Sequence, residues 1–436
     1  MAAPLRVGLI GMGNVGAGVA RILMEHGPRM EQRTGRPIQL IRAAVRDVHK
    51  PRDYTPPAGM LTDDALSLVR SPDLDVVIEL IGGLRPAREL VLEALQAGKH
   101  VVTANKALLC EHGPELFAAA REAGKAIAFE AAVAGGIPII HVLGAAMTAN
   151  QVIEIRAILN GTSNFILTEM FQKGTPYDDV VREAQALGYA EADPSMDVKG
   201  TDAAQKLSLL AHLAFGTRAT PSDFIVQGID GIEPMDFKYA SSLGYRIKLL
   251  ATAKLVDGRL EMHVQPTLIH RENPIAQTEG PFNIVALDGD NVGRTVYSGR
   301  GAGQLPTASS VLADLVDVAV GRAQLTFPRL ELWHDAPQFP LQPIDEIRRR
   351  YYLRFLVLDK PHVMADITDI LGRNQISLAS VIQPESPEVE GGGGPPTVPL
   401  IIMTHRCREG QLRRAGEELR KLSCLLGEWK CLAVSD

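Results

Sequence analysis

Short β-branched runs and amphipathic helical windows alternate through the first 130 residues of the chain. The apolar runs have the length of buried strands. They fall at 5–10, 38–45, 74–80, 100–104 and 125–133. Helical patterns such as 86–98 and 113–124 lie between them and end at glycine, as helices often do. This alternation predicts an α/β fold with a Rossmann-like, doubly wound parallel sheet.

The pattern changes after about residue 135. Helical windows come first and strand-like stretches follow, which predicts a second, α+β domain over 135–304. The windows are 163–172, 177–187 and 198–214, and the strand-like stretches are 245–256 and 260–269. A glycine-rich turn then precedes a helix near 305–325, which we expect to return to the first domain (1–134) and complete it.

The last part of the chain has a third pattern. After a proline-containing connector at 337–343, strand and helix patterns follow in the order βαββαβ, which predicts a ferredoxin-like domain over 350–436. The strands are expected at 351–359, 376–384, 397–405 and 427–434, and the helices at 362–374 and near 409–423. The segment "EGGGGPP" between the second and third strands predicts a flexible hairpin loop.

A glycine loop follows the first predicted strand. In "VGLIGMGNVG", Gly11 suits a tight turn, Gly13 allows a pyrophosphate to approach the backbone, and Gly16 allows helix and strand to pack closely. Free N–H groups at the start of the helix, from Asn14 and Val15 onward, would face the phosphates. The setting of strand, turn and helix indicates a dinucleotide-binding site, and a close-packed turn without a ligand is the alternative.

The end of the second strand carries a divided signal for the choice of coenzyme. Arg46 could pair with a 2′-phosphate, whereas Asp47 could accept a ribose hydroxyl. We predict a preference for NADP(H), with NAD(H) as the second coenzyme. A surface ion pair is the alternative for both residues.

Carboxylates and a lysine are concentrated in "LGYAEADPSMDVKGTDAAQKLSLLAH" (187–212). Asp202 and Lys206 stand four positions apart and therefore share one helix face. A metal site is disfavoured because a lysine among the ligands would repel the cation. Proton transfer fits better, since a lysine ammonium can protonate an alkoxide formed by hydride transfer. Asp197 could instead cap the helix 198–214.

Lys106 lies in "VVTANKALL" (101–109), at the carboxyl end of the fourth predicted strand. Ligands of open α/β sheets bind at this edge, so Lys106 is expected to point toward the nicotinamide and the substrate. Thr103 in the same segment is a further predicted coenzyme contact. An exposed turn lysine is the alternative.

Bulk properties narrow the class of protein. The net charge of −6 gives no basic footprint for nucleic acid, and four scattered cysteines suit a reduced, cytoplasmic protein. The N-terminal apolar run is too short for a signal peptide, and no apolar segment reaches the ~20 residues of a membrane-spanning helix. We therefore expect a small-molecule enzyme without nucleic-acid or membrane partners.

Several motifs together resemble the homoserine dehydrogenase family over roughly residues 4–330. These are "GMGNVG", "TANKALL", "EAAVAGGIPII", "NGTSNFIL", "LGYAEADPSMDVKGTDAAQKL" and "GRGAGQLPTASSVLAD". The C-terminal unit resembles an ACT regulatory domain. The few residues before the glycine loop could not hold an aspartate kinase, so the chain is expected to be a monofunctional form. The resemblance implies NAD(P)H-dependent interconversion of L-aspartate 4-semialdehyde and L-homoserine, on the route to threonine, methionine and isoleucine.

The resemblance also implies that 135–304 is a catalytic and dimerisation domain, and it assigns roles to individual residues. Lys206 is implied as proton donor and acceptor, Lys106 as its partner across the substrate, and Asp197 as a residue tied to catalysis. The implied substrate contacts are Glu191, Asp202, Thr162 and Tyr189. The implied coenzyme contacts outside the glycine loop include Gly188 and Gly303. A monovalent cation, sodium or potassium, is implied at Glu130, Val133, Gly135 and Ile137.

The ACT resemblance has one departure. Where ACT domains commonly carry D-x-P-G, this chain has Asp359, Lys360, Pro361 and His362. The histidine could crowd the effector pocket, so the unit either binds threonine or serves assembly alone. A homodimer is expected from the family and from apolar strands within 245–269 that could extend a sheet across a two-fold axis. ACT pairing could raise it to a tetramer.

Two other functions remain as hypotheses. The first is another two-domain NAD(P)-dependent amino-acid dehydrogenase, which a substrate panel would reveal. The second is a nucleotide sensor with an ACT module and no chemistry. A sensor would have lost the polar site, yet Lys106, Glu191, Asp202 and Lys206 are all present.

Overall fold

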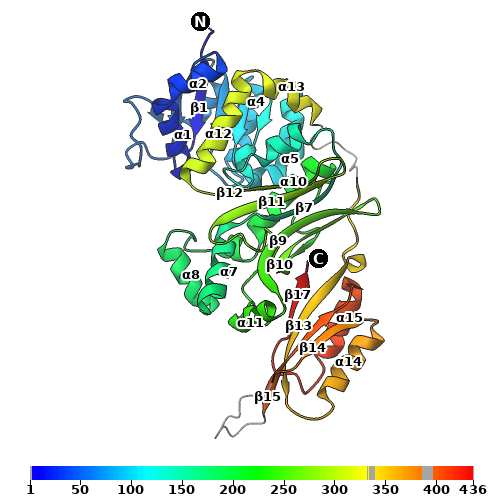
Figure 1. The fold of residues 1–436 in the computed structure, drawn as a ribbon. Coiled ribbons are helices and arrows are strands. Elements are labelled where there is room, and N and C mark those ends of the chain that lie inside the picture. Colours follow the sequence, from blue (N-terminus) through cyan, green and yellow to red (C-terminus); the bar gives the residue numbers. More distant parts are fainter. Residues whose placement is uncertain (1, 331, 333–338, 385–395, 436) are drawn as a thin grey trace. The chain divides into compact units, whose positions relative to one another are not determined.

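The computed structural model describes residues 2–330, 332, 339–384 and 396–435 (Figure 1). The chain divides into two compact units, each with its own core. The first unit comprises 1–161, 202–223 and 282–340, and the second comprises 162–201, 224–281 and 341–436. We describe each unit separately.

A parallel sheet forms the core of the first unit. Its strand order is β3-β2-β1-β4-β5-β6, so the strands before β4 are added on one side of β1 and the later strands on the other side. The strands are β1 (Leu5–Ile10), β2 (Ile38–Ala44), β3 (Leu61–Thr62), β4 (Val76–Glu79), β5 (His100–Thr103) and β6 (Ile127–Ala128). The central strands are almost entirely apolar and buried because helices cover the sheet. The predicted α/β class with a Rossmann-like sheet is confirmed.

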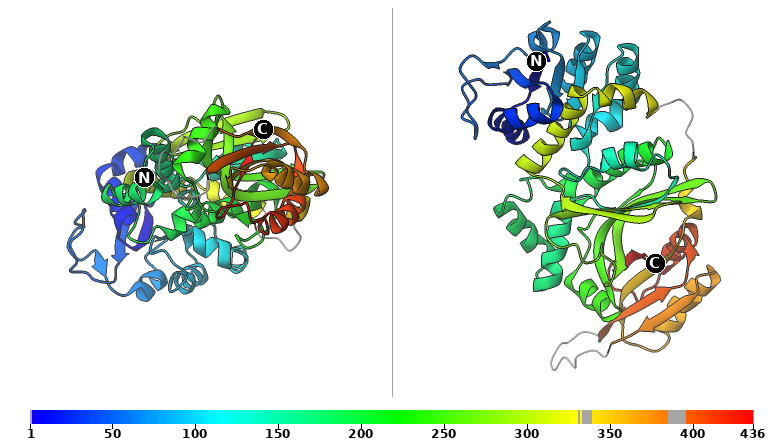
Figure 2. Two further views of the ribbon diagram at one scale, coloured as in Figure 1. Left: turned by 90° about the horizontal axis from the view of Figure 1, so that it is seen from below. Right: turned by 45° about the horizontal axis from the view of Figure 1, so that its top comes forward.

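Helices from distant parts of the chain cover this sheet. Helix α12 (Gln304–Ala319) packs along α1 (Asn14–Glu25), and the two lie side by side in Figures 1 and 2. Gly18 makes this contact close, since a Cβ there would lie 2.8 Å from the Gln304 side chain. The second row of helices consists of α3 (Ala65–Arg70), α4 (Ala87–Gln96) and α5 (Lys106–Glu122).

The first unit also holds an antiparallel sheet and a long helix. The strands β7 (Val152–Ile158), β11 (Phe282–Gly289) and β12 (Gly293–Arg300) pair in the order β12-β11-β7. Helix α10 (Thr201–Phe215) belongs to this unit from Asp202 onward. The smaller elements are α2 (Gly27–Thr34), η1 (Glu130–Ala132), α6 (Ile139–His141), η2 (Val142–Ala146), α13 (Arg322–Thr326) and η3 (Phe327–Arg329).

The second unit has a mixed sheet in the order β9-β10-β17-β13-β15-β14. Its strands are β9 (Tyr245–Val256), β10 (Arg259–His270), β13 (Arg348–Leu358), β14 (Leu378–Ile382), β15 (Thr397–Thr404) and β17 (Lys430–Val434). Strand β17 pairs with both β13 and β10, so one sheet runs from the C-terminal module into the hairpin of β9 and β10. Other elements are α7 (Gly161–Lys173), α8 (Tyr177–Ala186), α9 (Ser195–Val198), β8 (Ile225–Val226), α11 (Pro234–Ser242), η4 (Ile344–Glu346) and β16 (Cys407–Arg408).

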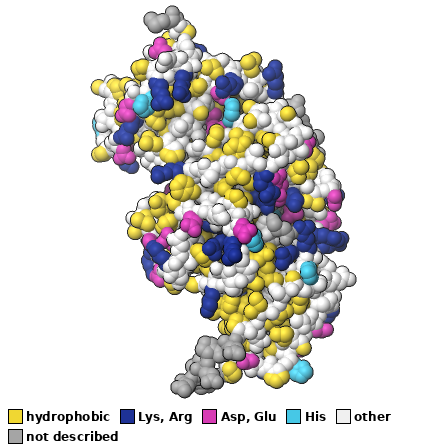
Figure 3. Space-filling model, viewed as in Figure 1, with side chains coloured by type: hydrophobic (Ala, Val, Ile, Leu, Met, Phe, Trp, Pro, Cys, Tyr) yellow, Lys and Arg dark blue, Asp and Glu magenta, His cyan; other side chains and the backbone are white. Residues whose placement is uncertain are grey.

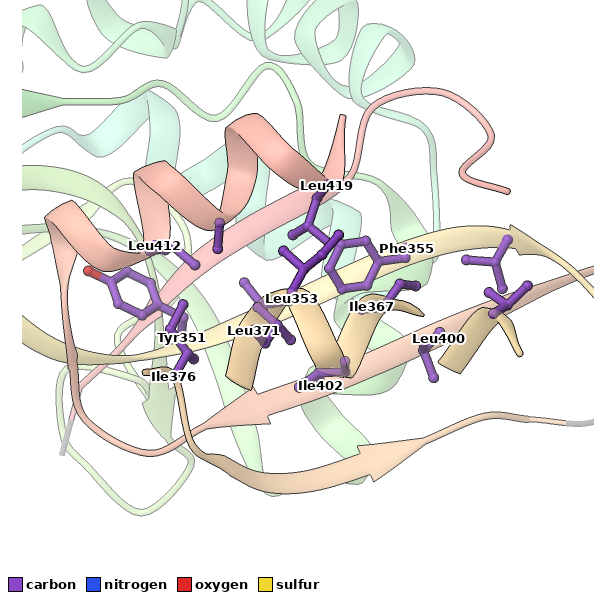
Figure 4. Packing of buried hydrophobic residues seen from close by; sticks show 14 of the residues in the cluster. Tyr351, Leu353, Phe355, Ile367, Leu371, Ile376, Leu400, Ile402, Leu412 and Leu419 are labelled. Carbon is purple, nitrogen blue, oxygen red and sulfur yellow. The ribbon is translucent and has the colours of Figure 1, made fainter. Parts of the chain in front are cut away.

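Within residues 348–434 the strand order β17-β13-β15-β14 is that of a ferredoxin-like sheet, as predicted. Helices α14 (Val363–Arg373) and α15 (Glu409–Leu419) cover one face. Figure 4 shows Phe355 and Leu353 of β13 meeting Ile367 of α14 and Leu419 of α15 in an apolar layer. The alternation of the strands and the 3.6-residue period of the helices produce this layer.

Three predicted elements were wrong in part. The apolar run 125–133 is a strand only at Ile127–Ala128, and the turn that follows is the 3-10 helix η1. The helix predicted at 113–124 begins at Lys106, because Asn105 caps it and Pro114 is accommodated within it. The helix predicted at 198–214 is divided by Gly200, which has φ +82°, so Asp197 lies inside α9 and is no cap for α10.

Two predictions concern residues outside the described part of the chain. The glycine-rich hairpin loop falls almost wholly within 385–395, and the connector 337–343 is described only from residue 339 onward. Among the described residues, none of the helices combines the length and hydropathy that crossing a bilayer would require.

Candidate active site

The carboxyl ends of β4 and β5 are held together by a buried carboxylate. Glu79, fully buried, accepts a hydrogen bond from the Thr103 hydroxyl at 2.6 Å and from the backbone N–H groups of Ile81 and Gly82. The Thr103 hydroxyl in turn accepts from the Asn105 N–H at 3.0 Å. These bonds fix the point at which β5 ends and α5 begins.

Lys106, the first residue of α5, meets Asp202 of α10, which also pairs with Lys206. Its Nζ lies 3.1 Å from Asp202 Oδ1, and Lys206 Nζ lies 2.7 Å from Asp202 Oδ2. One carboxylate therefore bridges two ammonium groups. The sequence placed Asp202 and Lys206 on one helix face, and the fold of the first unit brings Lys106 to them.

The Lys206 ammonium has a second fixed acceptor. It donates to the Leu159 carbonyl at 2.8 Å, and the Asn283 amide donates to the same carbonyl at 3.1 Å. Asn160 holds the shared carboxylate from another side, with Nδ2 2.8 Å from Asp202 Oδ2. The Lys206 side chain is only 12% exposed, so its position is defined by these contacts.

The electrostatics of this cluster favour the charged carboxylate. Burial alone would raise the pKa of Asp202, but the charges of Lys206 and Lys106 and the hydrogen bonds from Asn160 and Lys206 outweigh it. The net result is a pKa well below the usual range. An ionised Asp202 thus holds two ammonium groups, one of them 31% exposed and able to meet a ligand.

The glycine loop leaves room for a ligand at one position. A Cβ at Gly11 would lie 2.7 Å from the Leu80 carbonyl, and a Cβ at Gly16 would lie 2.1 Å from the Gly11 oxygen. At Gly13, by contrast, nothing described lies within 4 Å of such an atom. Gly11 and Gly16 are therefore required by packing, and Gly13 leaves open space at the start of α1 that a phosphate could enter.

A cleft of about 940 Å³ runs from this loop to the end of β2. Gly11, Gly13 and Asn14 line one end, and Arg46, Lys50 and Arg52 line the other. Asp47 also borders it, and its Oδ1 accepts the His49 N–H at 2.8 Å. The cleft has the size of a cofactor site.

Not every predicted coenzyme residue borders this cleft. Thr103 and Lys106 belong to the strand-end network and the ammonium cluster described above. Val15 lies within α1 and Gly303 precedes α12 with φ +121°. Gly188 belongs to the second unit, where it ends α8 with φ +75°.

The remaining predicted substrate residues lie in the second unit. The Thr162 hydroxyl donates to the Tyr189 carbonyl at 2.6 Å, so these two positions are joined. The Ser163 hydroxyl donates to the Asp197 carbonyl at 2.8 Å, which ties α9 to α7. Glu191 follows α8, and its carbonyl accepts from Gln185.

The predicted cation loop turns tightly within the first unit. Glu130 is 5% exposed, and its two carboxylate oxygens accept the N–H groups of Ile140 and His141 at 2.9 and 2.8 Å. The Gly135 carbonyl accepts from Ser310 at 2.6 Å. Burial and the nearby Asp317 raise the pKa of Glu130 to about 7, against the effect of the two hydrogen bonds.

This donor set suits a hard monovalent cation. The carbonyl oxygens of Val133, Gly135 and Ile137 would supply neutral ligands, and Glu130 would supply one negative charge. Among the residues that the structure describes, no three His, Cys, Asp or Glu side chains are placed to hold a metal ion.

The sequence did not single out several residues that organise the site. Glu79, Asn105, Asn160 and Asn283 fix the strand ends and the shared carboxylate through the contacts given above. A carboxylate closing the apolar run "LDVVIEL" was a usable signal for Glu79, and Asn160 opens the quoted motif "NGTSN". Asn283 had no signal, because its contact with Leu159 joins strands far apart in sequence.

Known proteins match this chain along its whole length. Residues 11–130 match the NAD-binding domain of homoserine dehydrogenase, residues 138–316 the homoserine dehydrogenase domain, and residues 351–424 the ACT domain. A homoserine dehydrogenase of Pseudomonas aeruginosa is 44% identical over 97% of each chain, and one of Neisseria gonorrhoeae is 40% identical. The chain belongs to the homoserine dehydrogenase family.

Solved structures agree with this assignment. A homoserine dehydrogenase from Thiobacillus denitrificans superposes with a TM-score of 0.91 at 42% identity, covering 99% of this chain and 98% of the other. A hyperthermophilic archaeal homoserine dehydrogenase in complex with NADPH gives 0.62 at 26% identity over 73% of this chain. The chain is thus an oxidoreductase with homoserine dehydrogenase function, and this first hypothesis is confirmed over the other dehydrogenase and the sensor.

Proposed function

We propose that Lys206 is the proton donor and acceptor in the interconversion of L-aspartate 4-semialdehyde and L-homoserine. The observation that carries the proposal is the cluster in which Asp202 bridges Lys206 and Lys106 at the carboxyl edge of the parallel sheet. The nicotinamide coenzyme, when bound, supplies or accepts the hydride. The chain's own residues handle the proton and orient the substrate.

Lys206 is suited to a single proton transfer at the substrate oxygen. Asp202 and the Leu159 carbonyl each hold one of the three ammonium protons, which leaves the third to point elsewhere. As the aldehyde becomes an alkoxide, this third N–H can protonate the oxygen, and the neutral amine can recover a proton in the reverse direction. Lys106 supplies a second positive charge that stabilises the alkoxide.

The substrate's own ammonium group requires acidic partners. We assign this role to Glu191 and Asp202, with Thr162 and Tyr189 as further contacts and Asp197 as a residue tied to catalysis. For the residues of the second unit the support is the family motif and the hydrogen bond that joins Thr162 to Tyr189.

We assign NADP(H) as the preferred coenzyme and NAD(H) as the second. Arg46, Lys50 and Arg52 line the cleft at the end of β2, which favours a 2′-phosphate. Gly11, Gly13 and Asn14 border the same cleft, and Val15, Gly16, Thr103, Gly188 and Gly303 complete the proposed coenzyme set. Arg46→Ala is expected to weaken NADPH binding about tenfold or more and NADH binding far less. Fluorescence titration of both coenzymes decides this, and equal weakening would mean that Arg46 does not read the phosphate.

A sodium or potassium ion at Glu130, Val133, Gly135 and Ile137 is part of the proposal. Its support is the buried carboxylate with a raised pKa and the backbone turn around Gly135, which has φ +50°. A bound cation would favour the ionised form of Glu130 and stabilise this turn beside α12.

Assembly and regulation complete the proposal. We propose a homodimer, with a tetramer formed through the ACT modules. Strand β10 offers no free edge, because β9 occupies one side and β8 and β17 the other, so the expected extension through 245–269 is wrong for β10. The edge strand β12, with Val296 43% exposed, is the better candidate.

Threonine is the effector that the ACT module is proposed to take. His362 keeps the left-handed backbone, with φ +73°, that the usual glycine would adopt, and its side chain is exposed. The departure from D-x-P-G therefore changes the side chain at this position but keeps the backbone conformation of the turn. A cytoplasmic location is proposed on the four cysteines, all of which are free thiols.

The limits of the three domains also remain a proposal. They are 1–134 with the returning helix near 305–325, 135–304, and 350–436. The packing of α12 against α1 supports the returning helix.

The decisive experiment is an initial-rate measurement of L-homoserine oxidation, with NADP and NAD in parallel, sodium or choline as the cation, and threonine present or absent. The expected result is turnover that is faster with NADP, stimulated by sodium and lowered by threonine. Turnover without a threonine response would assign the module to assembly alone. No turnover with either coenzyme in folded protein would overturn the proposed roles of Lys206 and Asp202.

A further inference from the structure

A second large cleft lies within the second unit, away from the proposed reacting groups. It has a volume of about 690 Å³ and opens between the loop 225–232, the strand β17 and the helix α15. Residues 359–363, at the start of α14, do not line it. The face drawn in Figure 3 carries acidic and basic side chains interspersed, and this cleft likewise combines both signs of charge.

A buried amide faces the interior of this cleft. Gln265 of β10 is 5% exposed and lines the cavity. Within the described part of the chain, its Nε2 has no hydrogen-bond acceptor. A buried donor without an acceptor costs free energy, so the position favours a ligand oxygen. The neighbouring Tyr351, which points toward Leu412 in Figure 4, already donates to Glu409 at 2.6 Å.

The charges around the cleft restrict the ligand. The lining carries five carboxylates and three basic side chains. The carboxylates would repel a polyphosphate, and the basic side chains would repel a simple cation. Lys430 Nζ lies beside the loop, 3.6 Å from where a Cβ of Gly231 would be, and Asp230 Oδ1 lies 3.0 Å from a Cβ of Gly228. Both signs are thus presented along one short loop. Leu412, Leu425 and Trp429 add an apolar wall.

The loop of this cleft is coupled to the helix that carries Asp197. The Ile229 N–H donates to the Val198 carbonyl at 2.8 Å. A Cβ at Gly228 would lie 2.5 Å from that same carbonyl and 2.7 Å from Lys199 Cα. The loop and the end of α9 are therefore in tight contact, and a shift of one displaces the other.

We propose that this cleft binds a small zwitterion of the α-amino acid class, whose carboxylate meets Gln265 and Lys430 and whose ammonium meets Asp230 and Glu409. Occupancy stabilises the loop 225–232 and, through Ile229 and Gly228, the position of α9 with Asp197. The cleft is then a regulatory site separate from the start of α14. Its effect on turnover rests on the proposed role of Asp197, whereas binding does not.

Trp429 provides a direct measurement of binding. Its ring stacks on Phe355 at 5.6 Å and borders the cleft. The chain has two tryptophans, so Trp333→Phe leaves Trp429 as the only reporter. This full-length variant is titrated, without coenzyme or homoserine, with each standard L-amino acid except tryptophan, and with acetate and ethylamine as half-charged controls. At least one amino acid is expected to change the emission at concentrations at which neither control does.

Substitutions then place the site. Gln265→Leu, which keeps the side-chain size, is expected to weaken binding about tenfold or more, and Lys430→Met at the rim to weaken it as well. The matched control is Thr252→Val, since the Thr252 hydroxyl is also buried without a partner in the described chain but does not line the cleft. It should bind like the parent.

Hydrogen exchange tests the coupling. The ligand is expected to slow exchange of the Ile229 amide and of the peptide 195–200. The proposal is overturned if no amino acid changes the emission, if ethylamine alone reproduces the change, or if both Gln265→Leu and Lys430→Met bind like the parent. Protection confined to 359–375 would place the ligand at α14 and also overturn it. The Lys206→Ala variant distinguishes this proposal from the proposed function. It is expected to lose turnover and still bind the amino acid in this cleft.

Discussion

Two buried carboxylates in the first unit behave in opposite ways. Asp202 is 7% exposed and Glu130 is 5% exposed, so burial is nearly the same. Yet the pKa of Asp202 is held below its usual range, whereas the pKa of Glu130 is raised to about 7. Burial by itself raises both, so the difference comes from the neighbours.

The neighbours differ in charge. Asp202 is bridged to Lys106 and Lys206 and accepts an amide N–H from Asn160. The Glu130 carboxylate accepts from two backbone N–H groups. The backbone N–H of Glu130 donates to the Asp314 carboxyl group at 3.0 Å. The pKa of Asp314 is likewise raised, by burial and by the charge of Glu130. The Asp202 cluster is electrostatically complete, whereas the acidic pair at Glu130 would gain from an added cation.

The largest expected effect comes from removing one ammonium group of the complete cluster. Lys206→Ala should lower turnover about 10²–10⁴-fold, because the variant lacks the ammonium group that is proposed to protonate the alkoxide, while NADPH binding persists. Steady-state rates and a coenzyme titration measure this. Gln205→Ala, the preceding residue on α10, is the control and should stay near the parent. Turnover of Lys206→Ala within a few-fold of the parent would remove Lys206 from the mechanism.

Removing the shared carboxylate tests the same cluster from the other side. Asp202→Asn leaves two ammonium groups without their counter-charge, which is expected to cost about 3 kcal/mol of unfolding free energy and to lower turnover about tenfold or more. Urea unfolding and initial rates check both quantities. Unchanged stability would mean that the ion pairs contribute nothing net at this position.

The acidic pair is tested by its response to a cation. The melting temperature of the parent should be higher in sodium chloride than in choline chloride. Sodium at a hundredfold excess over its Kd would add up to about 2.7 kcal/mol to the free energy of unfolding. Glu130→Gln should abolish this difference. Asp288→Asn is the control, because Asp288 is paired with Arg294 at 2.7 Å and lies outside the cation loop. A sodium response retained by Glu130→Gln would contradict the proposed site.

A third buried group, His212 on α10, is expected to give the smallest effect. Its charged neighbour is Arg218, which, like burial, lowers its pKa. Burial lowers the pKa of His212 to about 4, against a hydrogen bond at Thr217 that raises it. The unfolded chain therefore binds its proton at higher pH than the folded one. Stability is fully present above about pH 6.5 and is lost as the pH falls toward about 4, by up to ~1.4 kcal/mol per unit.

His212→Gln should flatten this acid limb of the stability curve. Urea midpoints at about pH 7, 5.5 and 4.5 measure it. His270→Gln, at a position whose side chain is 53% exposed, is the control and should keep the slope of the parent. An unchanged slope in His212→Gln would mean that other groups produce the acid sensitivity.

Periodicity predicted the elements of this chain better than it predicted their ends. The strands at 5–10 and 245–256 were located to the residue because both are long apolar runs that end at turn residues. The run 125–133 was not, since the buried turn of the cation loop is as apolar as a strand. Helix α5 began earlier than predicted because its cap, Asn105, depends on bonds to Gly83 and Thr103.

The sequence by itself determined the α/β class, the glycine loop and the pairing of Asp202 with Lys206, because strand and helix periods and the i, i+4 spacing are local properties. Tertiary structure alone decided that Lys106 reaches Asp202, that Asn160 and Asn283 orient the cluster, and that Gln265 faces a cleft. These contacts join residues far apart in the chain, and their energies depend on which charges packing places together. For the same reason the opposite pKa shifts of Asp202 and Glu130 could be found only in the folded chain.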